Sequence, residues 1–142
     1  MSKVFAFLIF SLFLVSSAFA AQGDIIISAS DISPTAKFYS SDIDGISVEV
    51  LAVKASDGSI RTAFNACQVC YGSGAGYYRQ SGAVLICQNC GNRFRTDQIE
   101  KFKGGCNPIP ITAKDKLSKD GQIIISREFL SQSKKYFSYR RR

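Results

Sequence analysis

The stretch that decides the fold reads CQVCYGSGAGYYRQSGAVLICQNC and spans Cys67 to Cys90. It begins and ends with a Cys-x-x-Cys pair, and 16 residues separate Cys70 from Cys87. A Cys-x-x-Cys turn places two sulfur atoms on one side of a tight knuckle, and two knuckles at this spacing form a four-thiolate site. The spacing therefore predicts that Cys67, Cys70, Cys87 and Cys90 hold a metal. Four thiolates suit zinc and iron–sulfur clusters equally.

A fifth cysteine lies in the segment Gly104-Gly105-Cys106-Asn107-Pro108. The two glycines remove side chains at a place where a bulky centre would press on the backbone. A tetrahedral ion needs only four thiolates, whereas a multi-iron centre has more positions to fill. We therefore expect Cys106 to bind the cofactor with the other four, as a ligand or a direct neighbour of the centre.

The chain has 142 residues and no histidine. This composition excludes a Ser-His-Asp triad, a Cys-His nucleophile pair, a histidine metal ligand and a CxxCH haem attachment. No pair of carboxylates near the cysteines suggests acid–base catalysis. We therefore expect a redox or electron carrier in preference to an enzyme with its own substrate.

Disulfide chemistry is the competing interpretation of the cysteines. An exported protein meets an oxidising compartment, where thiols pair. Five cysteines leave one unpaired, however, and a disulfide within Cys-x-x-Cys closes a loop too small to stabilise much. A thiol–disulfide oxidoreductase stays open as an alternative, although a reactive pair normally opens a helix and both pairs here follow strand-like segments.

The segments around the cysteines have the pattern of β-hairpins. Residues 46–53 alternate apolar and polar side chains, the Asp57-Gly58 turn follows, and residues 60–65 return to Cys67. Residues 77–79 and 83–86 form a second such pair that leads to Cys87. The sequence predicts a mainly β (α+β) small single domain of β-hairpins with a two-CxxC metal site. One or two short helices are expected, at residues 96–102 and 127–134.

The two ends of the chain resemble each other. Residues 25–40 read IIISASDISPTAKFYS and residues 123–138 read IIISREFLSQSKKYFS. The similarity predicts two strand–turn–strand units that bracket the cysteine region, with chance similarity of an Ile/Ser pattern as the alternative.

The first twenty residues have the features of a secretory signal peptide. Lys3 precedes an apolar run from Val4 to Val15, and Ala18-Phe19-Ala20 is a cleavage site of the A-x-A type. We expect residues 1–20 to be removed, with an uncleaved membrane anchor as the alternative. Residues 21–142 then form one Cys-rich metal-binding domain on the periplasmic side or the outer face of the cytoplasmic membrane.

Positive charge is concentrated in the C-terminal part of the chain. Residues 21–92 carry 4 basic and 6 acidic side chains, whereas residues 93–142 carry 13 and 5. An exported protein rarely meets nucleic acid, so we expect none as a partner. The basic part fits a solvated face, an acidic partner or an anionic membrane surface.

The combined motif resembles the FtrD-like family of membrane iron–sulfur proteins. The resemblance rests on residues 61–71, 76–82, 87–94 and 104–108, and it covers the chain from Ile25 to Phe137. It implies an iron–sulfur or related metal centre linked to bacterial iron uptake, with a membrane permease or redox protein as partner.

The leading expectation is therefore an exported metal-binding or iron–sulfur domain that transfers electrons in iron or other metal handling. The cofactor is expected to be an iron–sulfur cluster or a single Fe or Zn ion. The alternatives are a structural, zinc-ribbon-like interaction domain and a thiol–disulfide oxidoreductase.

Overall fold

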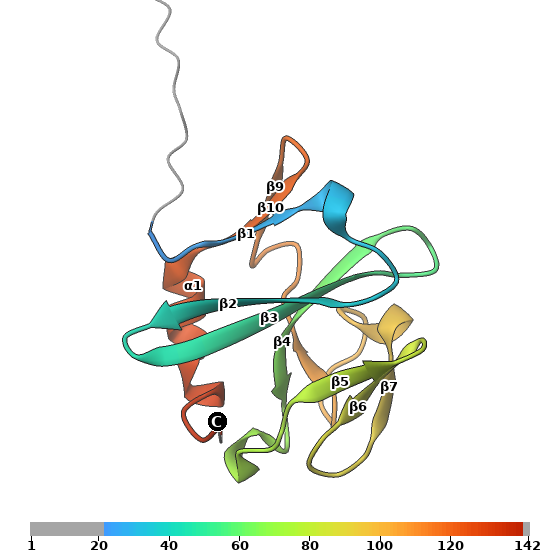
Figure 1. Cartoon of the computed structure of the whole chain (residues 1–142), viewed down its shortest axis with the longest axis vertical. Helices are drawn as coiled ribbons and strands as arrows, with labels where there is room; N and C mark the ends of the chain where they lie inside the picture. Colours follow the sequence, from blue (N-terminus) through green and yellow to red (C-terminus); the bar gives the residue numbers. More distant parts are fainter. Residues whose placement is uncertain (1–21, 141–142) are drawn as a thin grey trace, which may run out of the picture.

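The computed structural model describes residues 22–140 (Figure 1), so the expected signal peptide and its cleavage site lie outside the described residues. Within them the chain forms ten β-strands, one α-helix and four single-turn 3₁₀ helices. The strands are β1 (Ile25–Ser28), β2 (Lys37–Ile43), β3 (Ile46–Lys54), β4 (Ile60–Cys67), β5 (Tyr78–Ser81), β6 (Val84–Cys87), β7 (Arg93–Arg95), β8 (Pro108–Pro110), β9 (Leu117–Lys119) and β10 (Gln122–Ile125). The helices are η1 (Ala29–Asp31), η2 (Tyr71–Ser73), η3 (Thr96–Gln98), α1 (Arg127–Ser133) and η4 (Lys134–Tyr136).

The strands form three antiparallel sheets, in the orders β1-β10-β9, β2-β3-β4-β8 and β5-β6-β7. Figure 1 shows the four-stranded sheet in the middle of the molecule, with the β1-β10-β9 sheet above it and the β5-β6-β7 sheet at the lower right. The expected mainly β class, built from hairpins with one short α-helix, is confirmed.

Three hairpins turn at an Asp-Gly pair. Asp44-Gly45 joins β2 to β3, Asp57-Gly58 lies between β3 and β4, and Asp120-Gly121 joins β9 to β10. In the first and third pair both residues have positive φ, for example 54° at Asp44 and 81° at Gly45. This conformation matches the twist of the flanking strands and is inexpensive only for residues such as glycine, aspartate and asparagine.

Strands β3 and β4 of the central sheet are buried on both faces. In β3, Val48, Val50 and Ala52 belong to one hydrophobic cluster, whereas Leu51 and Val53 belong to another. Successive side chains of a strand point to opposite faces, so each face of β3 and β4 serves its own core. The first core contains β1, β10 and α1, and the second contains β5, β6 and the cysteines.

The two ends of the chain meet in one sheet. β1 pairs with β10, with Ile25 opposite Ile125 and Ile27 opposite Ile123. The similarity of the two ends stops there: residues 37–40 begin strand β2, whereas the matching residues 135–138 lie in the 3₁₀ helix η4 and the turn after it. The prediction of two equivalent strand–turn–strand units is therefore wrong. The Ser126 side chain accepts a hydrogen bond from the Phe129 N–H and caps the helix, which favours helix over strand here.

The other expected helix is shorter than the sequence suggested. Of residues 96–102, only Thr96–Gln98 form a 3₁₀ turn, and Glu100 has a φ of 68° that ends any helix. Among residues 22–140, no helix is both long and apolar enough to cross a membrane.

Candidate metal centre

Two strands carry the first cysteine of each pair to the same place. β4 ends at Cys67 and β6 ends at Cys87, so each Cys-x-x-Cys turn begins where a strand stops. In the turn after Cys67, the Cys70 N–H donates a hydrogen bond to the Cys67 sulfur. In the turn after Cys87, the Gly91 N–H donates a hydrogen bond to the Cys87 carbonyl. Sulfur atoms at the start of such turns face the amides of the turn, which favours thiolates.

The fifth cysteine reaches this site through β8. Pro108, the first residue of β8, lies opposite Cys67 in the sheet, and Cys106 precedes it by two residues. The Gln68 N–H donates to the Asn107 carbonyl, which fixes the segment against the first knuckle. Gly104 has a φ of 99°, and a Cβ atom added at this position would meet no other residue within 4 Å. Backbone conformation at Gly104, and not crowding by the protein, explains a glycine there.

All five sulfur atoms converge. The Cys106 sulfur lies 3.3 Å from that of Cys67, 3.9 Å from that of Cys70 and 2.8 Å from that of Cys90. The sulfur atoms of Cys67, Cys70, Cys87 and Cys106 all lie within 4.8 Å of one another. Cys90 does not belong to this set of four, but its sulfur lies next to that of Cys106. All five cysteines carry free thiols.

The site has a buried side and an open side. Cys67 and Cys87 are fully buried among Tyr78, Leu85 and other members of the second core. Cys70 and Cys106 are partly buried, and Cys90 is exposed to solvent. A group bound here would be shielded from water on one side and accessible on the other.

The thiols differ in their tendency to ionise. Burial raises the pKa of Cys87 to about 11, and burial together with the hydrogen bond to Cys90 raises the pKa of Cys106. Hydrogen bonds from the Cys106 thiol and the Asn92 N–H lower the pKa of Cys90 to about 7. Because like charges so close together cannot all form unaided, full ionisation of this group requires a cation.

Side-chain amides hold the two knuckles and the Cys106 segment together. The Gln68 side-chain oxygen accepts from the Gly104 N–H, and the Asn92 side chain donates to the Cys106 carbonyl. Asn107 is buried; its side chain accepts from the Gly105 N–H at 2.9 Å and donates to the Pro108 carbonyl at 2.9 Å.

Asn107→Ala is expected to loosen this segment. It removes a buried hydrogen-bonding side chain and leaves the Gly105 N–H and the Pro108 carbonyl without these bonds, which costs about 1–3 kcal/mol. Urea denaturation of the metal-free protein measures that loss. An unchanged midpoint would contradict the role given to Asn107. Asn107→Asp keeps the acceptor for Gly105 but is expected to lose at least as much, because it buries a carboxylate against the Pro108 carbonyl and the Gln68 side-chain oxygen.

The loop between η3 and Cys106 is anchored on β4 by an ion pair. The Glu100 carboxylate accepts from the Thr62 N–H at 2.7 Å and from the Lys116 ammonium at 2.6 Å. Both side chains of the pair are largely buried. The pair therefore fixes Glu100, and through it the start of the loop that carries Cys106, against the central sheet.

One glycine allows the chain to pass directly over the first knuckle. A Cβ atom on Gly76 would lie 2.3 Å from the carbonyl carbon and oxygen of Cys70 and 2.5 Å from the Tyr71 nitrogen. In addition, the Gly76 carbonyl accepts from the Cys67 N–H at 2.7 Å. Since only backbone atoms meet the added carbon, no flexible side chain can move aside.

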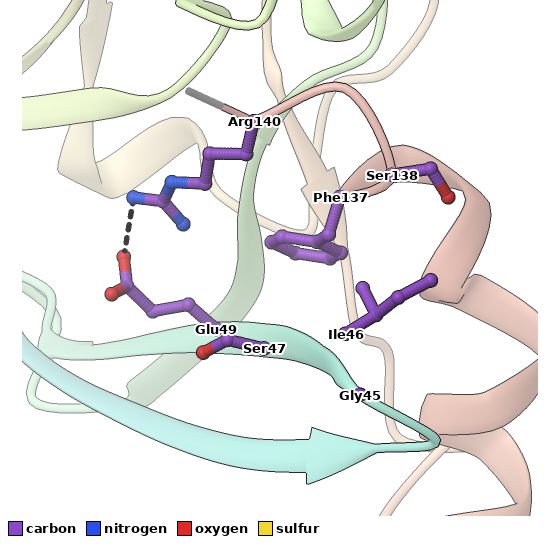
Figure 2. A pocket seen from close by; sticks show the side chains of 7 residues that line it. All are labelled: Gly45, Ile46, Ser47, Glu49, Phe137, Ser138 and Arg140. Atoms are coloured by element: carbon purple, nitrogen blue, oxygen red, sulfur yellow. Dashed lines mark hydrogen bonds and ion pairs between the residues drawn. The ribbon is translucent and has the colours of Figure 1, made fainter. Parts of the chain in front are cut away.

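The C-terminal segment covers the same knuckle from outside. Tyr71, which follows Cys70, packs edge-on against Tyr136 with ring centroids 5.1 Å apart. The Arg140 guanidinium lies over the Tyr77 ring at 4.8 Å and pairs with Glu49 at 3.0 Å. Figure 2 shows Arg140 reaching Glu49 beside a pocket of about 590 Å³, whose lining residues are Gly45, Ile46, Ser47, Glu49, Phe137, Ser138 and Arg140.

The sequence pointed to the cysteines but not to the residues that position them. The spacing of the pairs identified Cys67, Cys70, Cys87 and Cys90. The two glycines that precede Cys106 identified this fifth cysteine. Gly76, Asn107 and Gln68 were part of the quoted motifs without an assigned role, and their partners are known only from the fold. Of the aromatic residues near the pairs, Tyr78 and Phe94 pack in the core with the cysteines.

The comparisons with known proteins point to one family. A family model described as "Membrane iron-sulfur containing protein FtrD-like" matches residues 21–137. A search of the curated proteins finds no match. A solved structure, the quaternary ammonium Rieske monooxygenase CntA in complex with inhibitor MMV12, aligns with 77% of this chain and 32% of its own, at 16% identity and a TM-score of 0.47.

Proposed function

Since this chain belongs to the family of FtrD-like membrane iron–sulfur proteins, we propose that its five-cysteine site holds an iron–sulfur centre that carries electrons. The convergence of five sulfur atoms from three separate chain segments is the observation that carries the proposal. The family and the cysteine cluster together point to an iron–sulfur cluster as the cofactor.

The donor set fits such a centre. The grouped ligand atoms are all cysteine sulfurs, with no carboxylate oxygen among them, and soft thiolates select zinc, copper(I) and iron–sulfur clusters over harder ions. We propose that Cys67, Cys70 and Cys87 are ligands whichever metal is bound and whichever cysteine is the fourth ligand. Cys90, favoured by the sequence spacing, and Cys106, favoured by the sulfur distances, are then the two candidates for the fourth position.

The surroundings suit electron transfer. When bound, an iron–sulfur centre supplies a one-electron couple whose potential depends on exposure and on hydrogen bonds to sulfur. The buried side of the site excludes water through Tyr78, Leu85 and Phe94. The exposed Cys90 marks the side at which a partner can approach.

Reversible reduction tests the proposed activity. The iron-loaded protein, prepared without oxygen, is expected to lose and regain its visible absorption through repeated cycles of reduction and oxidation. The zinc-loaded protein is the matched control, because zinc undergoes no redox change. An iron-loaded protein whose spectrum does not respond to a strong reductant would contradict electron transfer.

A single metal ion in a structural site is the second candidate, and one observation favours it. Four ligands at a metal–sulfur distance of about 2.3 Å in a tetrahedron put sulfur atoms about 3.8 Å apart. The separations of 3.3 Å and 3.9 Å from Cys106 are close to that value. A multi-iron cluster would need the sulfur atoms to move apart. Metal content therefore decides between the two.

A thiol–disulfide oxidoreductase has less support. Reactive Cys-x-x-Cys pairs normally open a helix, whose N-terminus stabilises the thiolate. Here both pairs follow strands, and the α-helix of residues 22–140 begins at Arg127.

We also propose a place and partners for this activity. The family is described as a membrane protein family, and the signal-like first twenty residues favour export to the periplasm or the outer face of the cytoplasmic membrane. A permease or a redox protein in iron or other metal handling is the proposed partner. The basic C-terminal part would meet an acidic protein surface or anionic lipid.

A further inference from the structure

One buried polar group beside the centre has no use in the fold itself. Tyr78 is 1% exposed, and its hydroxyl completes no hydrogen bond to any residue between 22 and 140. A buried hydroxyl without a partner costs free energy, and a phenylalanine would fill the same space without that cost. An unsatisfied donor at this depth therefore points to a nearby group that becomes a better acceptor when the site is filled, as a cysteine sulfur does when its thiol loses the proton.

The backbone holds Tyr78 firmly in place. Tyr78 lies opposite Cys87 in the β5–β6 ladder, and its N–H donates to the Asn65 side-chain oxygen at 2.7 Å. Asn65 is itself buried in β4, and its amide donates to Glu49, which pairs with Arg140. A chain of polar contacts thus runs from the C-terminal segment to the backbone of Tyr78.

The Tyr78 side chain shares its core with the sulfur atoms. Tyr78 packs in one cluster with Cys67 and Cys87, with Cys70 and Cys106 at its edge. Of these sulfur atoms, that of Cys67 interacts with the Tyr78 hydroxyl without reaching hydrogen-bond geometry. A phenol ordinarily keeps its proton at neutral pH, so the Tyr78 hydroxyl has a proton to donate.

We propose that Tyr78 donates a hydrogen bond to the Cys67 sulfur of the loaded centre and thereby raises its reduction potential. This inference rests on the proposed iron–sulfur function. Reduction adds negative charge that is shared with the ligand sulfurs, and a donor pointed at one of them stabilises the reduced form more than the oxidised form. Tyr78 then raises the reduction potential of the centre without being one of its ligands.

Tyr78→Phe tests this, with Tyr77→Phe as the matched control. Tyr77 is the neighbouring residue, and its ring keeps its place under Arg140 without the hydroxyl. For iron-loaded Tyr78→Phe, we expect the ratio of reduced to oxidised centre at a fixed potential to fall about tenfold, which is 59 mV for a one-electron couple. The control is expected to keep the parent's potential.

A measurement on the metal-free proteins separates tuning from folding. Because Tyr78→Phe removes an unpaired buried group, the metal-free variant is expected to resist urea at least as well as the parent. In the loaded parent, the iron–sulfur stretching bands in resonance Raman spectra are expected to shift in D₂O by more than in Tyr78→Phe. A metal-free variant that unfolds at lower urea would show that the hydroxyl serves the fold, and would overturn the inference.

The outcomes for the inference and for the proposed function can be told apart. Equal potentials and equal Raman spectra in the iron-loaded parent and Tyr78→Phe would contradict the role of Tyr78 and leave the iron–sulfur centre intact. A parent protein that takes up neither iron nor sulfide would contradict the proposed function, and the inference with it.

Discussion

Cys67→Ser is expected to leave the protein without bound metal. Cys67 is fully buried, its sulfur lies 3.3 Å from that of Cys106, and it receives the N–H of Cys70. A serine oxygen is a harder and far less acidic ligand than a thiolate. Removal of a residue that only hydrogen-bonds to a metal ligand lowers the metal affinity about 10–100-fold. Removal of the ligand Cys67 itself is therefore expected to lower the metal affinity further. Metal analysis after desalting measures the effect.

The exposed side of the site provides the comparison. Cys90→Ser and Cys106→Ser each remove one of the two candidates for the fourth position. We expect the variant that loses the true fourth ligand to lose metal as Cys67→Ser does, and the other to keep metal with an altered spectrum. Full metal content in Cys67→Ser would contradict the thiolate site, whatever the other two variants do.

Gly76→Ala is expected to disrupt the first knuckle although it changes no ligand. The added carbon would lie 2.3 Å from backbone atoms of Cys70, so the segment from Cys70 to Tyr71 must move. Such overpacking costs about 1–3 kcal/mol, and here it also displaces a cysteine. We expect lower stability in urea and a loss of metal affinity together.

Gly72→Ala is the matched control. Gly72 lies in η2, four residues before Gly76, its φ is not positive, and a Cβ atom there would meet no other residue within 4 Å. Its effect on stability is expected to stay within about 0.5 kcal/mol, as for ordinary surface changes. Equal effects of the two substitutions would show that the close approach at Gly76 does not matter.

Local patterns were sufficient to predict the hairpins that carry the cysteine pairs. The alternation in residues 46–53 and the Asp57-Gly58 turn correspond to β3 and the start of β4, because side-chain alternation and turn conformation are properties of a few adjacent residues. The same kind of turn lies at Asp44-Gly45, between β2 and β3. Strand β2 was expected only through the similarity of the two ends, because its side chains are mostly exposed and show no apolar alternation.

Long-range pairing is what the sequence could not supply. Cys106 lies beside Cys67 because β8 pairs with β4, although the two cysteines are 39 positions apart in the chain. No local pattern encodes this pairing, whereas the β5–β6 hairpin, which places Tyr78 opposite Cys87, was predicted from its local pattern. The similar sequences at the two ends also misled, since Ser126 caps the helix α1, whereas the matching Ser28 makes no such cap and precedes a single 3₁₀ turn and then β2.

Iron and acid-labile sulfide, measured on protein purified without oxygen, test the central claim most directly. We predict iron and sulfide in equal amounts in the parent protein and neither in Cys67→Ser. Zinc alone, or iron without sulfide, would contradict the iron–sulfur centre and favour the single-ion site. A parent protein with five titratable thiols and no metal would contradict both.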